Sequence, residues 1–145
     1  MVDAWLLDKH CENNAWGYQN HGIIVMSNGK VLKYNLANKP RQIHFTLEDK
    51  IQAAEIEKYK YLQPNQLIKI SLLVECVVST ENCNDWIEKG ISTDSGKILT
   101  TLFYKKDEKY QQKIIGHGGN FSKILQGKCV EDILHVIDEL YQLKI

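Results

Sequence analysis

Histidine and cysteine are the side chains of this 145-residue chain best suited to bind a metal ion or to act as a nucleophile. A zinc site needs three or four ligands, often at short spacings such as Cys-x-x-Cys. The sequence offers His10-Cys11 with His21, or Cys76 with Cys83, and neither set has such a spacing. We therefore predict no metal site and no cofactor, and we expect reduced thiols throughout. The complete set is His10, His21, His44, His117, His135, Cys11, Cys76, Cys83 and Cys129.

His117 lies in a glycine-rich segment, Gly116-His117-Gly118-Gly119-Asn120. An imidazole with a pKa near neutrality can serve as a general acid or base. A small metal-independent hydrolase or ribonuclease that uses His117 is therefore one alternative function. The segment lacks the Gly-Lys-Ser/Thr ending of a phosphate loop, and it is typical of a loop that leads from a strand to a final helix. We assign no catalytic residue.

Aromatic residues in polar surroundings are the candidates for binding another molecule. Residues 10–21 form a polar segment that holds Trp16 and Tyr18, and Trp86 follows a second polar stretch. Tryptophan and tyrosine are enriched among the residues that contribute most to protein interfaces. The alternative, which the sequence leaves open, is that these rings pack inward beneath a surface loop.

A β-hairpin is expected to position the first of these segments. Asn28-Gly29 stands between two apolar runs, and this dipeptide favours a two-residue hairpin turn. Such a turn would pair Val25 with Leu32 and Ile23 with Tyr34, with all four on the core side of the ribbon. Residues 98–104 and 110–115 are rich in β-branched and aromatic side chains and predict a second hairpin across a charged loop.

Helices are expected between and after the hairpins. Thr46 with Asp49 resembles a capping box, which predicts a helix that runs from residue 47 to residue 62 and stops before Pro64. Residues 65–79 fit an apolar period of two as well as a helical stripe, and their length favours a helix that forms an αα-hairpin with its predecessor. The last helix has one apolar stripe, formed by Val130, Ile133, Leu134, Ile137, Leu140 and Tyr141.

These elements give the order ββ-αα-ββ-α and predict a single α+β domain over residues 1–145, in which helices cover one face of an antiparallel sheet. The 18 basic and 18 acidic residues balance, and Arg41 is the only arginine, so the chain lacks the basic excess of a nucleic-acid-binding protein. We expect no signal peptide, because the first residues have no basic start before an apolar stretch, and we expect no membrane span, because no apolar run is long enough. We expect a soluble cytoplasmic protein whose oligomeric state is left open.

The features that stand out are Trp16-Gly17, the Asn28-Gly29 hairpin, Asp94-x-Gly96 before an aromatic strand that ends at Tyr104, Gly116-x-x-Gly119-Asn120, and the amphipathic last helix. In this layout the chain resembles small bacterial immunity proteins of polymorphic-toxin and contact-dependent growth-inhibition systems. The resemblance implies a protein that binds and neutralises a cognate toxin domain.

Many immunity proteins are acidic, whereas this chain is neutral, so its local acidic patches become the candidates for contact with a basic toxin. A small-ligand-binding regulatory domain, with a pocket between sheet and helices, is the remaining alternative. The predicted partner-binding residues are Trp16, Tyr18, Glu55, Glu57, Trp86, Asp132, Asp138 and Glu139.

Overall fold

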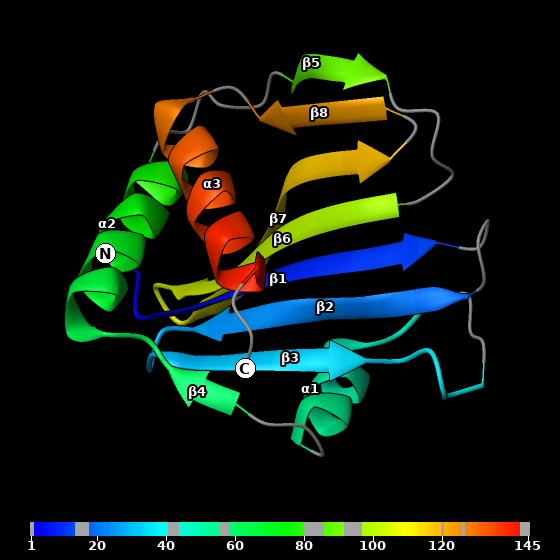
Figure 1. The fold of residues 1–145 in the computed structure, drawn as a ribbon. Coiled ribbons are helices and arrows are strands. Elements are labelled where there is room, and N and C mark those ends of the chain that lie inside the picture. Colours follow the sequence, from blue (N-terminus) through cyan, green and yellow to red (C-terminus); the bar gives the residue numbers. More distant parts are fainter. Residues whose placement is uncertain are drawn as a thin grey trace.

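An antiparallel sheet of eight strands is the framework of the described part of the chain (Figure 1). The computed structural model describes residues 2–13, 18–40, 44–55, 59–79, 86–91, 97–119, 121–125 and 127–142. Neighbouring strands follow the order β4-β3-β2-β1-β6-β7-β8-β5. The elements are β1 (Ala4–Asn13), β2 (Gln19–Met26), β3 (Lys30–Asn35), α1 (Leu47–Glu55), β4 (Tyr59–Tyr61), α2 (Pro64–Ser79), β5 (Trp86–Ile91), β6 (Lys97–Lys106), β7 (Lys109–Gly119), β8 (Phe121–Leu125) and α3 (Lys128–Gln142).

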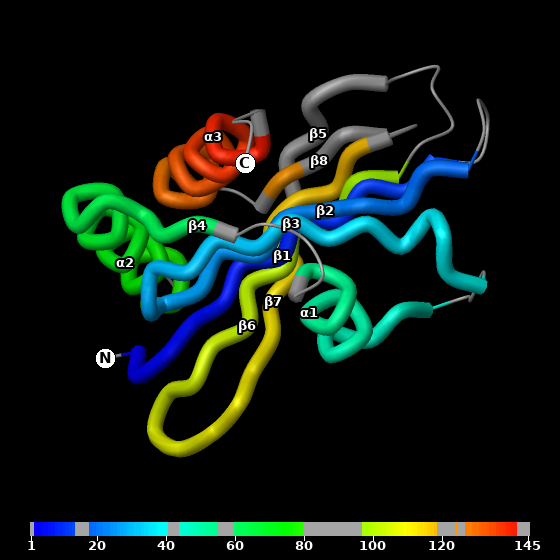
Figure 2. Tube along the Cα trace, turned by 60° about the horizontal axis from the view of Figure 1, so that its bottom comes forward, coloured from blue at the N-terminus to red at the C-terminus, as the bar shows by residue number. Residues whose placement is uncertain are grey.

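The helices lie on both faces of the sheet. The predicted α+β class with an antiparallel sheet and three helices is confirmed among the described residues, but the expectation that helices cover one face is wrong. Figure 2 shows α2 and α3 on one side and α1 on the other. Two apolar cores result, because Ile23 and Val25 pack with α2 and α3, whereas Ile24 packs with α1. All three of these β2 side chains are fully buried.

The Asn28-Gly29 hairpin forms, but its register differs from the prediction by one residue. Three residues, Ser27 to Gly29, separate β2 from β3, and Gly29 has a φ of 90°. The strands therefore pair Val25 with Val31 and Gly22 with Tyr34. A shift of one residue exchanges the faces of all side chains in a strand. Apolarity alone did not fix the register here, because both faces of this ribbon are buried.

The first two helices do not form the predicted αα-hairpin. The Thr46–Asp49 capping box is confirmed, since the Asp49 amide donates to Thr46 Oγ1 at 3.1 Å and the Thr46 amide donates to Asp49 Oδ2 at 2.9 Å. However, α1 ends at Glu55, and β4 pairs with β3 before α2 begins at Pro64. Long-range pairing thus overrides helix propensity in this segment. The predicted helix over residues 65–79 is confirmed as α2, and the last helix as α3.

Several strands extend into segments that were expected to be loops. Residues 10–13 belong to β1 and residues 19–21 to β2, while residues 14–17 lie outside the described part of the chain. The predicted loop over residues 116–120 is likewise wrong for residues 116–119, which continue β7. These residues of β7 pair with β6, where the register shifts between Thr100 and Thr101. Gly116 and His117 also pair with a further strand, β8.

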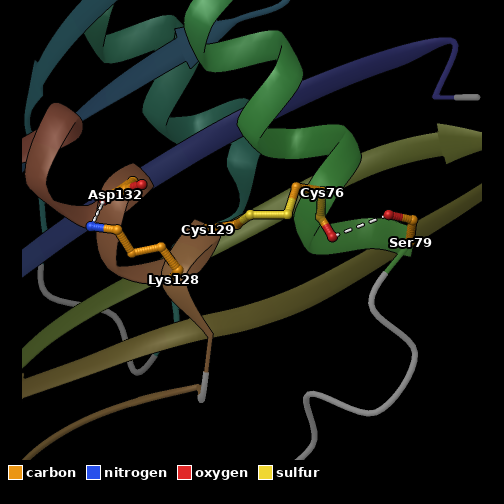
Figure 3. Close-up of a disulfide and its surroundings, with 5 residues drawn as sticks. All are labelled: Cys76, Ser79, Lys128, Cys129 and Asp132. Atoms are coloured by element: carbon orange, nitrogen blue, oxygen red, sulfur yellow. Dashed lines mark hydrogen bonds and ion pairs between the residues drawn. A yellow bond between two sulfur atoms is a disulfide. The ribbon is translucent and has the colours of Figure 1, made fainter.

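A disulfide joins α2 to α3 through Cys76 and Cys129 (Figure 3). Their Cα atoms lie 6.1 Å apart, within the usual range for a disulfide. The expectation of reduced thiols is therefore wrong for this pair, which the 53-residue separation concealed in the sequence. Cys11 has a free thiol, and Cys83 lies outside the described residues.

Candidate protein-binding surface

Helix α2 carries apolar side chains on its outer face as well as on the face that it buries in the core. Its inner face buries Ile70, Val74 and Val77 in the core. On its outer face, Ile68 is 60% exposed and Leu72 is 66% exposed. These two residues are four positions apart and therefore adjacent on the helix surface. Exposed apolar side chains that lie together and are bordered by polar residues form a surface suited to a partner.

A groove of about 430 Å³ runs beside this stripe, between α2 and the start of β1. The inner part of the groove is apolar, and nearly buried Trp5 contributes to it. We call this groove together with Ile68 and Leu72 the α2 surface. Its described lining consists of Val2, Asp3, Trp5, Ser27, Leu67, Ile68, Ser71, Leu72 and Glu75.

The charge of the α2 surface is acidic. Asp3 and Glu75 are its charged lining residues, and none of the described lining residues is basic. Glu75 also holds the segment that precedes β1, since its Oε1 accepts a hydrogen bond from the Val2 amide at 2.7 Å. An apolar strip beside two carboxylates can bind a protein surface that combines apolar and basic side chains.

A polar cluster beneath α1 is buried and serves the fold. Asp8 accepts hydrogen bonds from Lys50 Nζ and from the Tyr34 hydroxyl, each at 2.7 Å. Burial, with nearby Asp8 as the next cause, raises the pKa of Tyr34 well above its usual value. His10 contacts buried Asn20, and burial lowers the pKa of its ring. Because these groups satisfy one another away from solvent, we interpret the cluster as structural.

A second polar cluster surrounds Tyr141 near the end of α3. Its hydroxyl contacts His21, and Lys9 contacts Asp138. Burial raises the pKa of the Cys11 thiol and lowers that of His21, so both groups are neutral near pH 7. A neutral thiol is a poor nucleophile, and the arrangement therefore does not favour cysteine catalysis. Its contacts fix the end of α3 against β1 and β2.

The acids predicted on α3 are each engaged within the chain. Asp132 contacts Lys128 at 2.9 Å, Glu139 contacts His135 at 2.9 Å, and Asp138 contacts Lys9. The first two pairs have the i,i+4 spacing of surface ion pairs on a helix. The two lysines balance Asp132 and Asp138, whereas His135 balances the charge of Glu139 only when its ring is protonated.

The remaining predicted residues do not form one described surface. The hydroxyl of half-buried Tyr18 accepts a hydrogen bond from Asn20 Nδ2 at 2.9 Å. Trp16 and Glu57 lie outside the described residues. Glu55 ends α1 and Trp86 begins β5, but their side chains lie outside the described part of the structure.

His117, the residue of the enzyme alternative, stands within β7 opposite Leu99 and is half-buried.

The α2 surface was missed in the sequence, although a signal for it was present. Residues 65–79 fitted both a strand period and a helical stripe. In a helix, that double fit means that apolar side chains occupy more than one face. Ile68 and Leu72 belong to the strand-like pattern of alternating apolar residues, and in the helix they form the exposed outer stripe.

Comparison of the chain with protein-family models, curated proteins and solved structures gave no significant match. In the described part of the chain, no helix has the length and apolarity required to cross a bilayer. Within the same residues, no three histidine, cysteine or acidic side chains gather as metal ligands would.

Proposed function

We propose that this protein is a cytoplasmic protein-binding module that acts as an immunity protein and neutralises a cognate toxin domain through the α2 surface. The observation that carries the proposal is the outer apolar stripe of α2 beside an acidic groove. Inhibition would be steric and electrostatic, because a bound module covers the toxin's active site or a surface that the toxin needs. No catalytic group of this chain is required.

The apolar stripe supplies the affinity in this proposal. Full burial of an aliphatic side chain contributes about 1.5–3 kcal/mol. Ile68 and Leu72 are 60% and 66% exposed, so covering them contributes about 1–2 kcal/mol each. Each would therefore change the dissociation constant by about tenfold, as expected for central residues of an interface.

The acidic groove supplies specificity and rate. Asp3 and Glu75 give the α2 surface local negative charge although the whole chain is neutral. Complementary charge accelerates encounter with a basic partner and disfavours acidic ones. The chain as a whole is neutral, whereas many of the immunity proteins that it resembles are acidic. The local acidic surface would supply the negative charge that the whole chain lacks.

A cytoplasmic location has a consequence for the Cys76–Cys129 bond. Cytoplasmic glutathione and thioredoxin keep most thiols reduced. We therefore propose that the reduced protein also folds and binds its partner, since the α2–α3 contact includes buried apolar side chains as well as the disulfide.

The test begins with co-purification of the tagged protein with its toxin partner from the native cell, followed by affinity measurements on variants. Leu72→Lys removes an apolar side chain and places a positive charge on the acidic surface, where it would repel a basic partner. We therefore expect the toxin to bind at least tenfold more weakly. Gln52→Lys is the matched control, because it adds the same charge at an exposed position of α1, on the other side of the sheet from α2. It should bind normally. Co-expression with the toxin should then show growth protection that Leu72→Lys loses.

Two outcomes would contradict the proposal. If Leu72→Lys and Ile68→Lys bind the toxin as tightly as the unmodified chain, the α2 surface is not the interface. If the purified chain forms a dimer that Leu72→Lys converts to a monomer, the surface joins two copies of this chain instead. Light scattering after size-exclusion chromatography measures the second outcome.

A further inference from the structure

A second apolar hollow lies on the opposite face of the sheet from α2. Its described lining comes from the start of β1, the β2–β3 turn, the first residue of α1 and the β6–β7 hairpin. Its volume is about 360 Å³, within the range of small-molecule sites. Figure 2 shows the β6–β7 hairpin extending beyond the end of the sheet that lies near α1. We call this site the hairpin hollow.

Strand pairing places the side chains of the hairpin hollow on one face. Leu6 pairs with both Met26 and Phe103, so the three side chains point in the same direction. Leu47 of α1 closes one side, and Tyr110 of β7, which is 82% exposed, stands at the open side. The walls are therefore aliphatic and aromatic, as in pockets that bind flat apolar molecules.

The described lining of the hairpin hollow contains one charged side chain, Lys105. Its Nζ lies 5.4 Å from the centre of the Tyr110 ring. The polar groups of two other lining residues already have partners in the chain. Asn28 Oδ1 accepts from the Lys30 amide, and Gln111 Oε1 accepts from the Tyr104 hydroxyl.

We propose that the hairpin hollow binds a small aromatic carboxylic acid. The ring would pack against Leu6 and Phe103, and the carboxylate would lie near Lys105 Nζ. The volume admits a molecule of about two fused rings, at the lower end of ligand size. The described lining has one lysine and no acidic residue, so it favours a ligand that carries a single negative charge. This inference goes beyond the proposed function and does not rest on it, although the hairpin hollow and the α2 surface share Trp5 and Ser27.

The test uses naphthoate as the probe and uncharged naphthamide as its matched analogue. Two-dimensional amide NMR of the full chain, titrated with each compound, reports both the affinity and the residues that respond. We expect naphthoate to shift the amides of Leu6, Met26 and Phe103, and to bind about fivefold more tightly than naphthamide, as one exposed charge pair contributes.

Variants separate the roles of charge and shape. Lys105→Gln should weaken naphthoate binding about fivefold and leave naphthamide binding unchanged. Lys106→Gln is the control, because the next residue of β6 points to the opposite face of the hairpin. Ala4→Trp should abolish binding of both compounds, since it fills the hollow from an exposed position without removing a core side chain.

The proposal is overturned if naphthoate causes no shifts, or if the shifts cluster at α2 instead. Equal binding of both compounds, with no effect of Lys105→Gln, would equally refute the assignment of a carboxylate. Because the unmodified chain and Lys106→Gln give folded reference spectra, loss of binding in a variant is distinguished from loss of structure.

Discussion

Removal of the Cys76–Cys129 disulfide should lower the free energy of unfolding by several kcal/mol. The bond closes a loop across 53 residues of sequence. In the chain-entropy model, a loop of that length removes about 14 cal/mol/K from the unfolded chain, which is about 4 kcal/mol near room temperature. Measured effects are typically about 2–4 kcal/mol. The loss is a large fraction of the roughly 5–15 kcal/mol that stabilises an ordinary domain.

Urea unfolding of the unmodified chain, with and without reductant, measures this contribution. With an m-value of about 2 kcal/mol/M, a loss of 4 kcal/mol lowers the midpoint by roughly 2 M. The double variant Cys76→Ala/Cys129→Ala is the control. It should unfold at the same urea concentration in both conditions, close to the reduced unmodified chain. Cys11 remains present in both proteins, so its thiol does not account for a difference.

The covalent bond itself is checked by alkylating the denatured, unreduced protein and mapping its peptides. Cys76 and Cys129 should remain unlabelled until reductant is added. Complete labelling of both cysteines before reduction would refute the bond. If the bond is present but reductant leaves the midpoint unchanged, the loop-entropy reasoning is wrong for this fold.

Two further predictions concern buried polar groups. Asp8→Asn should lower the free energy of unfolding by about 3–5 kcal/mol, because it leaves the buried Lys50 ammonium without its counter-charge. In urea unfolding, the double variant Asp8→Asn/Lys50→Met should recover most of this loss, and a double variant no more stable than Asp8→Asn would contradict the reasoning. Burial lowers the pKa values of His10 and His21, so their contribution to stability is present above about pH 6.5 and is lost as the pH falls through the folded-state values. The urea midpoint should therefore fall between about pH 7 and about pH 5, and it should fall less in His10→Gln/His21→Gln; equal slopes would refute the assignment.

Local patterns predicted the elements whose signals lie within a few residues. The capping box at Thr46 and Asp49 and the apolar stripe of α3 are such signals, and both are confirmed. The hairpin turn was also predicted, but its register was not. Ile23, Ile24 and Val25 are all buried, so no polar position marked one face of β2 as exposed.

The missed elements depend on partners far away in the sequence. Strand β1 looks polar because it contains Asp8 and Lys9, yet Asp8 pairs with Lys50 and Lys9 with Asp138. Strand β4 exists through its pairing with β3. The candidate site was missed for a related reason, since the apolar outer side of α2 became recognisable only when its inner side was known to be buried.

The three-residue length of β4 limits how this protein can associate with others. An exposed edge strand offers backbone groups to which another chain can add a strand, and very short or bulged edges suppress that reaction. The sheet ends in β4 on one side, and on the other in β5, whose pairing with β8 shifts register between Glu88 and Gly90. Both ends therefore disfavour strand addition and fibre growth. If the protein binds a toxin as proposed, recognition would accordingly depend on side chains, which discriminate between partners far better than a bare backbone does.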